Sequence, residues 1–472
     1  MKVLCVDFGS TYTKLVEVDL ELRAVTGAAL AHTTIHSHVL DGFYAALRQL
    51  PQGDISRYDE IRAASSAAGG LKMIAVGLVP SLTANAAKLA ANSAGAKLIK
   101  TYSYELSPQE ASEIQAAAPD IVLLSGGIDG GNKAVITKNA AVLAGIKADF
   151  AVVLAGNKSV ASQCADTLRA AGKPVDVVEN VMPSFGVLNI QPAKSAIRDI
   201  FIKRIVSAKG LDDALAIVSG DIIPTPLAVF NATELLGTLC PLVAIDVGGA
   251  TTDVYSMADG SPTRQFAVQK GLVEPFAKRS VEGDLGVRYS IPSLLEEVGQ
   301  EHIARLSGLP EADVSAWLEA CQEDQSLLPS PSQQPIDDAL AAACTHLAML
   351  RHTGTLESIY THSGEVFVQN GKDLSEIGLL LGTGGSIINS SRAEWILSHA
   401  LDIPQDPGNG ILGAPPGLPQ KSRVTSEKEL YALRPKAPRI VVDRQNILTT
   451  MGLLARTHPD IAIDIMKKNL SI

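Results

Sequence analysis

The sequence predicts an α/β protein with two lobes, each built around a β-hairpin whose loop is rich in glycine and hydroxyl side chains. Three observations support this. Two loops repeat one pattern, DFGSTYTK at Asp7–Lys14 and DVGGATTD at Asp246–Asp253. Of the 472 residues 46% are hydrophobic but only 4% are aromatic, so small aliphatic side chains must build the core, which favours parallel strands covered by helices. Helix-like and strand-like segments also alternate regularly from residue 83 to residue 190.

Each of the two loops joins a pair of strand-like apolar runs. The first lies between Val3–Val6 and Leu15–Val18, and the second lies between Leu242–Ile245 and Val254–Met257. When the two copies are aligned, the matching pairs are Asp7 with Asp246, Gly9 with Gly248, and Thr13 with Thr252. One such loop is also typical of an ordinary hairpin turn, but two copies in the same context favour a shared function.

The composition of these loops suits a phosphate group. Glycine lets the backbone approach an anion closely, and turn amides and hydroxyls donate to phosphate oxygens. The residues that we expect to contact a nucleotide are Gly9, Ser10, Thr11 and Thr13 in the first loop and Gly248, Gly249, Ala250, Thr251 and Thr252 in the second. Asp7 and Asp246 are expected to hold Mg²⁺ through water, since this hard cation prefers carboxylate and phosphate oxygens. Lys14 adds a positive charge, so Asp7, Asp246 and Lys14 are the predicted catalytic residues.

A third glycine-rich element follows in LLLGTGGSI at Leu379–Ile387. Glycines at a strand-to-helix turn let a flat adenine or ribose lie against the backbone, near a helix N-terminus. The residues expected to line this adenosine turn are Gly382, Thr383, Gly384, Gly385 and Ser386. Taken singly, the segment is also compatible with a plain turn.

Two further groups of polar residues leave alternatives open. Glu282 and Asp284 flank Gly283 before a helical run, either as an acidic helix cap or as a loop that contacts nucleotide or metal. Asp129 and Asn157 follow expected strands of the alternating region. Ligands of open α/β sheets bind beyond the carboxyl ends of strands, so these two residues mark either a second site or tight turns.

The remaining segments follow from hydrophobic periodicity and turn residues. Expected strands span residues 24–35, 61–65, 74–79, 97–102, 120–125, 150–155, 175–178 and 439–442, and expected helices span residues 41–50, 84–94, 108–118, 132–144, 159–171, 193–209, 227–239 and 445–455. Residues 322–336 and 404–419 are rich in proline and are expected to be an exposed linker and a loop.

In the order loop, loop and glycine turn, the chain resembles the nucleotide site of the actin, Hsp70 and sugar-kinase superfamily. The resemblance implies a two-lobed actin-like ATPase fold, with duplicated phosphate hairpins that clamp ATP and Mg²⁺ between the lobes. The expected domains are a first ATPase lobe at 1–82 and 191–240, an additional α/β region at 83–190 that faces a partner, a second lobe with the adenosine turn at 241–400, and a C-terminal loop, strand and helix at 401–472 that pack back on the body.

Composition excludes several other classes of function. The net charge is −10 without a run of Lys or Arg, which argues against a nucleic acid partner. No uninterrupted apolar stretch is long enough for a membrane span, and the start shows no secretory pattern, so a cytoplasmic location is expected. The five cysteines are scattered without a CxxC pair, which favours reduced thiols over an iron–sulfur cluster or a zinc site.

A second, more specific resemblance rests on strings in a fixed order. The resemblance is to the glutamate mutase accessory (MutL) protein family, and the strings that carry it are SSAAGGLKM, LLSGGIDGG, NVMPSFGVLN, DVGGATTDVYS and EPFAKRSVEGDLGVR. It extends from about Asp7 to Arg288, with weaker agreement through Gly385 and the tail. Ser280 and Val287 depart mildly from the pattern, where threonine and methionine are expected.

The family resemblance implies an ATPase that reactivates an adenosylcobalamin-dependent mutase by releasing damaged cobalamin. The expected ligands are ATP and Mg²⁺, the expected partner is the mutase, and no cobalamin site of the chain's own is identified. Which mutase is served and the oligomeric state stay open. Two rivals share the fold: a small-molecule kinase with Asp253 or Asp129 as base, and a filament-forming or chaperone-like ATPase.

Overall fold

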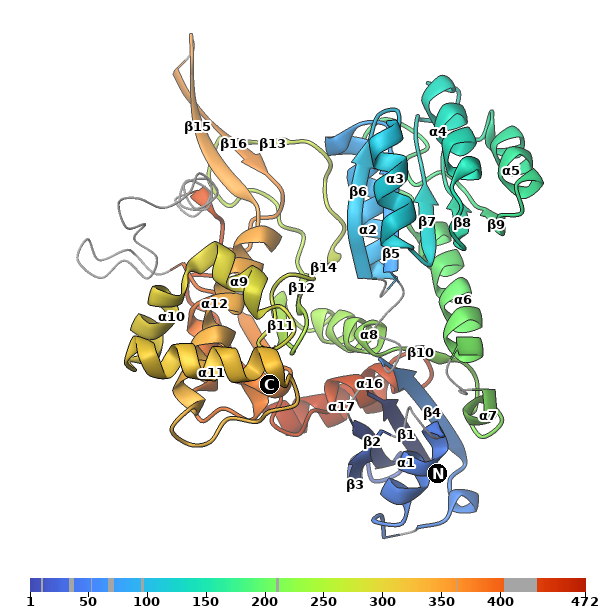
Figure 1. Ribbon diagram of the computed structural model, residues 1–472. Coiled ribbons are helices and arrows are strands. Elements are labelled where there is room, and N and C mark those ends of the chain that lie inside the picture. The colour runs from blue at the N-terminus through green and yellow to red at the C-terminus, as the bar shows by residue number, and fades with distance from the viewer. Residues whose placement is uncertain are drawn as a thin grey trace. The chain divides into compact units, whose positions relative to one another are not determined.

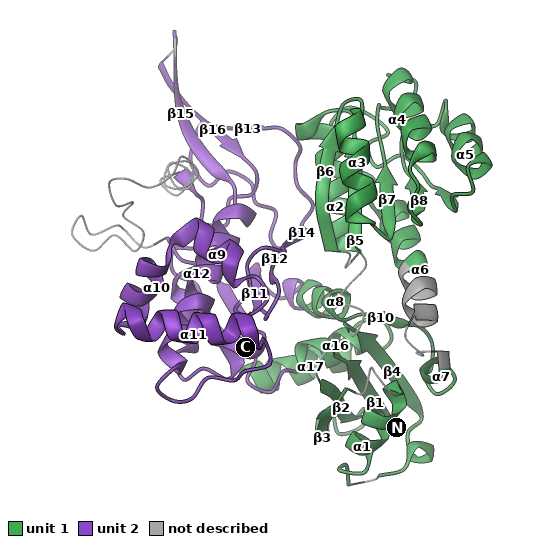
Figure 2. Ribbon diagram, in the orientation of Figure 1, with its two compact units in different colours: residues 1–235, 447–472 green, residues 236–446 purple. Residues whose placement is uncertain are grey.

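The computed structural model describes residues 1–9, 12–33, 38–51, 53–66, 72–94, 97–208, 212–362, 364–402 and 431–472 (Figure 1). The chain divides into two compact units, residues 1–235 with 447–472 and residues 236–446 (Figure 2). Each unit has its own sheets and its own core, so each is considered by itself.

The first unit contains a five-stranded sheet in the order β10-β4-β1-β2-β3. Its strands are β1 (Lys2–Phe8), β2 (Tyr12–Asp19), β3 (Ala24–His32), β4 (Glu60–Ser65) and β10 (Ile222–Pro224). The first three strands form an antiparallel meander, whereas β4 runs parallel to β1 and β10 runs parallel to β4. The central strand β1 is apolar and mostly buried, because it is covered on both faces.

The second unit repeats this arrangement. Its five-stranded sheet has the order β14-β12-β11-β17-β18. The strands are β11 (Leu242–Val247), β12 (Thr252–Met257), β14 (Ala277–Glu282), β17 (Leu379–Thr383) and β18 (Arg439–Val442). In both sheets three antiparallel strands come first in the chain, and the fourth and fifth then add in parallel on the side of the first. The predicted α/β fold with a duplicated hairpin is therefore confirmed.

The first unit also holds a wholly parallel sheet in the order β6-β5-β7-β8-β9. Its strands are β5 (Lys72–Gly77), β6 (Lys97–Ser103), β7 (Ile121–Leu124), β8 (Ala151–Leu154) and β9 (Val175–Val177), and the connecting helices are α2 (Asn85–Ser93), α3 (Pro108–Ala117), α4 (Ala134–Gly145) and α5 (Ala161–Ala170). Strands and helices confirm the alternation that the sequence predicts. Strand β5 differs from expectation, since it pairs with β6 and β7 in this sheet and not in the first lobe. Its apolar run resembles the strands of either sheet, so only strand pairing decides its place.

Helices cover the sheets of both units. The first unit adds α1 (Val39–Leu47), the short turns η1 (Ile55–Arg57) and η2 (Pro80–Ala84), α6 (Gln191–Ala208), α7 (Asp212–Leu215), α16 (Leu448–Leu454) and α17 (Pro459–Leu470), whereas α8 (Thr225–Gly237) crosses the boundary between the units. The second unit adds α9 (Ile291–Val298), α10 (Gln300–Ser307), α11 (Glu311–Glu323), α12 (Gln334–His352), α13 (Gly385–Ile388) and α14 (Ala393–Ser398). Helix α12 is buried along nearly its whole length and forms the centre of the second core.

A small three-stranded sheet in the second unit was not anticipated from the sequence. It consists of β13 (Ala267–Lys270), β15 (Thr355–Thr361) and β16 (Gly364–Asn370) in the order β13-β16-β15. Its strands are largely exposed, so they lack the alternation of apolar and polar residues by which a half-buried strand is recognised.

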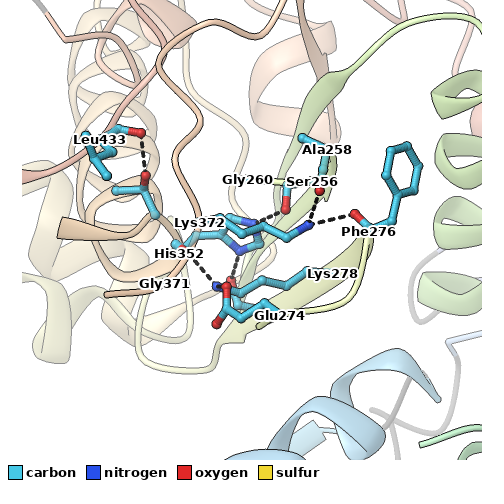
Figure 3. Close-up of polar contacts among 12 residues, drawn as sticks. Ser256, Ala258, Gly260, Glu274, Phe276, Lys278, His352, Gly371, Lys372 and Leu433 are labelled. Carbon is cyan, nitrogen blue, oxygen red and sulfur yellow. Dashed lines mark hydrogen bonds and ion pairs between the residues drawn. The ribbon is translucent and has the colours of Figure 1, made fainter. Parts of the chain in front are cut away.

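A buried polar cluster joins the root of this small sheet to the neighbouring strands (Figure 3). The ammonium group of Lys372 donates to the carbonyls of Ala258 and Phe276, both at 2.6 Å. The ring of His352 lies between the hydroxyls of Ser280 and Ser256, at 2.7 and 2.8 Å. Burial lowers the pKa of Lys372 to about 7. The cluster therefore ties Lys372, which follows β16, and His352, which precedes β15, to the strands beside the small sheet by hydrogen bonds.

The C-terminal region is divided between the units. Strand β18 extends the second sheet beside β17, whereas α16 and α17 belong to the first unit, with α16 packed on β1 and β4. The proline-rich loop expected at 404–419 lies outside the described residues, as do Ser10 and Thr11. Among the described segments, no helix combines the length and apolarity that crossing a bilayer requires.

Candidate functional site

The first phosphate loop is closed by a glycine. The amide of Gly9 donates to the carbonyl of Tyr12 at 3.1 Å, directly after the last strand pair, Phe8 with Thr13. A Cβ on Gly9 would lie only 2.5 Å from that carbonyl oxygen, so a larger residue cannot close this turn without a shift.

Asp7 lies at the carboxyl end of β1, directly opposite Lys14 on β2. Its Oδ1 accepts a hydrogen bond of 2.6 Å from the hydroxyl of Thr225, the first residue of α8. Burial raises the pKa of Asp7, while the Thr225 hydrogen bond and the charge of Lys14 oppose that rise. The structure therefore brings together two of the predicted catalytic residues and adds a third side chain.

Thr13 points to the other face of the same hairpin. Its side chain is fully buried, and its hydroxyl lies 3.1 Å from that of Thr33. Strand residues alternate between faces, so Thr13 lies opposite to the side that carries Asp7 and Lys14. The expected contact of Thr13 with nucleotide is thus limited to its backbone.

The second loop has the same closing hydrogen bond. The amide of Gly248 donates to the carbonyl of Thr251 at 2.9 Å, after the last strand pair, Val247 with Thr252. The hydroxyl of Thr252 is buried and donates to the carbonyl of Leu285. Thr252 therefore repeats both the position and the inward orientation of Thr13.

The segment after β14 forms hydrogen bonds to the backbone of the second loop. The amide of Arg288 donates to the carbonyl of Gly249 at 2.8 Å, and the hydroxyl of Ser290 donates to the carbonyl of Ala250 at 2.6 Å. A Cβ on Gly286 would lie 2.6 Å from the Gly249 oxygen. These hydrogen bonds come from residues of the second unit, and they fix the conformation of the loop.

Asp246 stands opposite Asp253 on the adjacent strand, the place that Lys14 holds in the first loop. Two carboxylates directly opposite each other repel. Arg279 on β14 compensates, since its NH2 and Nε atoms contact Asp253 Oδ1 at 2.7 and 3.0 Å. Both side chains of this ion pair are buried.

The glycine turn after β17 lies directly against Asp246. Gly384 has a φ of +88°, and a Cβ there would lie 2.4 Å from Asp246 Oδ1 and 2.6 Å from the Val247 carbonyl. Gly382 is packed against Leu397, whereas a Cβ on Gly385 would meet nothing closer than 3.9 Å. Of the predicted adenosine turn, Gly382 and Gly384 are thus required by packing, and Gly385 has space beside it. Thr383 is buried, and Ser386 lies in the first turn of α13.

The acidic segment after β14 is an ion-pair network. Arg351 in the last turn of α12 contacts Glu282 at 2.9 Å, Asp284 at 2.7 Å and Glu297 at 2.8 Å. Gly283 lies between the two carboxylates, and its carbonyl accepts from Ser290. These residues lie beside the second loop, but their carboxylates are already engaged by an arginine.

The second candidate site, at Asp129 and Asn157, is held together by internal hydrogen bonds. Asn157 accepts from the amide of Gly130 and donates to the carbonyls of two neighbouring loop residues. Asp129 accepts from the amide of Lys158 and from the side chain of Asn180, both at 3.0 Å. The geometry supports tight structural turns at this edge of the parallel sheet.

The first loop fits a hydrated magnesium ion. Thr225 occupies Oδ1 of Asp7, and among the described residues no hydrogen bond reaches Oδ2. Asp7 is only partly exposed, and the described chain groups no three His, Cys, Asp or Glu side chains that could enclose a metal. A single carboxylate oxygen beside the predicted phosphate loop suits Mg²⁺, which usually keeps several waters and takes few protein ligands.

The sequence did not reveal the side chains that contact the acidic residues of the two loops and of the segment after β14. Thr225 and Arg279 each come from a segment outside the loop motifs, and Arg351 comes from the far end of α12. Pro226, next to Thr225 in the sequence, signals only a helix start.

Comparisons with known proteins identify the family. A family model described as MutL protein matches residues 3–470. Protein MutL of Clostridium tetanomorphum is 41% identical over 478 residues, covering 99% of this chain and 98% of that protein.

Solved structures give weaker likenesses. An acetone carboxylase in its nucleotide-free state is 11% identical, with a TM-score of 0.38, over 96% of this chain and 70% of that one. Component A of (R)-2-hydroxyglutaryl-CoA dehydratase from Acidaminococcus fermentans is 8% identical, with a TM-score of 0.29, over 98% and 99%. These TM-scores, both below 0.5, are too low to support a statement about this chain. The match to the family model and the likeness to the clostridial protein, both over nearly the whole length, show that the chain belongs to the MutL family.

Proposed function

We propose that this protein hydrolyses ATP to reactivate an adenosylcobalamin-dependent mutase, such as glutamate mutase or a cobalamin-dependent aminomutase, by releasing damaged cobalamin from it. Membership of the MutL family supports the choice of partner. The observation that carries the ATPase part is the placement of Asp7 and Asp246. Each is the last but one residue of the first strand in a sheet with the same strand order, just before a loop that a glycine closes.

Phosphoryl transfer depends mainly on positioning and on neutralising charge, so it needs few reactive groups from the protein. Bound Mg²⁺ would neutralise phosphate charge. In our proposal Asp7 and Asp246 hold the waters of that ion, and one of the two orients the attacking water. The amides of the two loops contact phosphate oxygens, and Lys14 adds its charge beside Asp7.

A small-molecule kinase is less well supported. Such an enzyme needs a carboxylate that can accept a proton from the acceptor hydroxyl. The sequence offers two aspartates for this role as base, and both are already engaged. Asp253 is buried in an ion pair with Arg279, and Asp129 accepts hydrogen bonds within its own loops.

The proposal is tested by phosphate release from ATP and by recovery of mutase activity. A mutase inactivated by turnover or with hydroxocobalamin is mixed with the protein, ATP, Mg²⁺ and fresh adenosylcobalamin, and several cobalamin mutases are compared. We expect recovery with at least one mutase, faster phosphate release in its presence, and different capture of that mutase with ATP and with ADP. A protein that binds both mutase states equally shifts nothing, so equal capture without recovery would contradict the proposal.

A further inference from the structure

One hydrogen bond connects the predicted metal-binding aspartate to a residue far away in the sequence. The hydroxyl of Thr225 donates to Oδ1 of Asp7 at 2.6 Å, across a separation of 218 residues. Both residues belong to the first unit, and both are partly exposed. A hydrogen bond to an ionised carboxylate is shorter and stronger than a neutral one, so this contact restrains the Asp7 side chain.

Strand register explains how the two residues meet. In the order β10-β4-β1 all three strands are parallel, so their carboxyl ends lie at the same edge of the sheet. Asp7 pairs with Ala64 on β4, and Ala64 pairs with Ile223 on β10. Thr225 directly follows β10 as the first residue of α8, so it lies at the same edge of the sheet as Asp7. At this level the intervening strand β4 carries Ala64, whose side chain is a single methyl group.

The hydrogen bond also distinguishes the two carboxylate oxygens. Oδ1 is occupied by Thr225, and no hydrogen bond within the described chain reaches Oδ2. A carboxylate anchored through one oxygen presents the other in a fixed direction. Supporting residues of this kind set the orientation of metal ligands, and their loss typically reduces metal affinity or activity by about 10- to 100-fold.

We propose that Thr225 is a positioning residue that directs Oδ2 of Asp7 toward the hydrated Mg²⁺ of bound MgATP. The inference rests on the proposed nucleotide function and names a residue that the loop motifs do not contain. It requires the hydroxyl group specifically, because that group makes the contact. Serine should therefore replace threonine, whereas valine, of nearly the same shape, should not.

The chain offers a matched control in the same helix. Thr233 in α8 is fully buried, and within the described residues its hydroxyl donates to the carbonyls of Val229 and Phe230 in its own helix. Thr233→Val removes a buried hydroxyl without touching Asp7. Any effect shared by Thr225→Val and Thr233→Val would report on helix α8 and not on the aspartate.

The experiment is calorimetric titration with ATP in Mg²⁺ and in EDTA, on the full chain and on T225V, T225S and T233V. We expect T225V to lose about 10- to 100-fold in affinity for MgATP, with metal-free ATP binding unchanged. We expect T225S to stay within about threefold of the parent protein, and T233V to change neither affinity. If T225V does not fold, Thr225→Ala removes the same hydroxyl without adding a branched apolar group.

Three results would overturn the inference. One is unchanged MgATP affinity in T225V, and another is an equal loss with and without Mg²⁺, which indicates a purely structural role. A loss in T225S as large as in T225V would show that the hydroxyl is not responsible. If the parent protein binds no ATP at all, the proposed function fails together with this inference, whereas failure of T225V alone to differ leaves the proposed function standing.

Discussion

The two glycine-rich hairpin loops, after Asp7 and after Asp246, share one backbone conformation but carry different charges. In both, an aspartate is the last but one residue of the first strand, and a glycine amide donates to the carbonyl three residues later and closes the hairpin. Opposite the aspartate, however, the first loop has Lys14 and the second has Asp253. In the second loop the positive charge belongs to Arg279 on the neighbouring strand β14, which pairs with Asp253.

This difference shows that a repeated motif need not imply a repeated role. Asp7 has a cation opposite and a hydroxyl on one oxygen, and within the described chain no hydrogen bond reaches its other oxygen. Asp246 instead faces a buried ion pair and the backbone of Gly384. The two loops therefore present their aspartates in different surroundings, a cation and a hydroxyl in the first and a buried ion pair and a glycine backbone in the second.

The largest expected effect comes from removing either aspartate. Asp7→Ala and Asp246→Ala should each reduce ATP hydrolysis by at least about 100-fold, because both are polar strand-end residues that position charge in the transition state. The measurement is phosphate release at saturating ATP, with circular dichroism as a check of folding. Asp176→Ala, at an exposed position on β9, serves as the control and should keep the parent rate. If Asp7→Ala or Asp246→Ala hydrolyses ATP at the parent rate, that aspartate is not part of the site.

Breaking the ion pair of the second loop should destabilise the second unit. Arg279→Met leaves Asp253 buried without its partner, which typically costs about 3–5 kcal/mol. Both tryptophans, Trp317 and Trp395, lie in this unit, so fluorescence during urea unfolding reports on it selectively.

The matched control is Lys436→Met, which removes an exposed ion pair with Glu376 in the same unit and should cost less than about 1 kcal/mol. The double variant Asp253→Leu with Arg279→Met should recover much of the loss. If Arg279→Met and Lys436→Met have the same unfolding midpoint, the Arg279–Asp253 ion pair does not stabilise the second unit.

Acid should weaken the second unit, since burial lowers the pKa of His302 to about 4 and that of His346 to about 3. Between the ordinary histidine pKa near 6.5 and these values, the unfolded chain binds more protons than the folded chain. Stability is therefore lost as the pH falls through that window, by about 2 kcal/mol at pH 5 from His302 alone.

Hydrogen exchange at pH 7.5 and 5, corrected for intrinsic rates, tests this expectation. Amides of α10 and α12 should lose protection, and His302→Gln should reduce the loss. Protection of these helices that does not change between the two pH values would contradict the assignment.

The smallest effect is expected at the adenosine turn, where neighbouring glycines should differ. Gly385→Val adds a side chain into open space and should weaken ATP binding about tenfold with an unchanged thermal midpoint, if adenosine lies there as expected. Gly384→Ala places a methyl group against Asp246 and should lower both stability and hydrolysis. Calorimetric titration and thermal unfolding of both variants separate the two roles. Unchanged ATP affinity in Gly385→Val would make the whole turn structural.

Local sequence predicted the elements well where they are buried and periodic. The strands β1, β7, β8 and β17 are short apolar runs, and turn residues delimit them clearly. The exposed three-stranded sheet was missed, since its strands carry no alternation that a buried face would impose.

The sequence by itself determined the loop frame of the two phosphate hairpins. Aspartate, glycine and threonine spacing is a local property, because the turn closes within four residues of the same hairpin. Duplication of the loops, the parallel α/β region and the family were likewise readable, since all rest on short contiguous strings. The tertiary structure alone decided what surrounds the aspartates. Thr225, Arg279 and Arg351 reach the loops or their flanks from elements separated in the sequence, by way of strand register and helix packing. Such contacts leave no periodic trace along the chain, because each depends on which strands pair and not on the residues next to it.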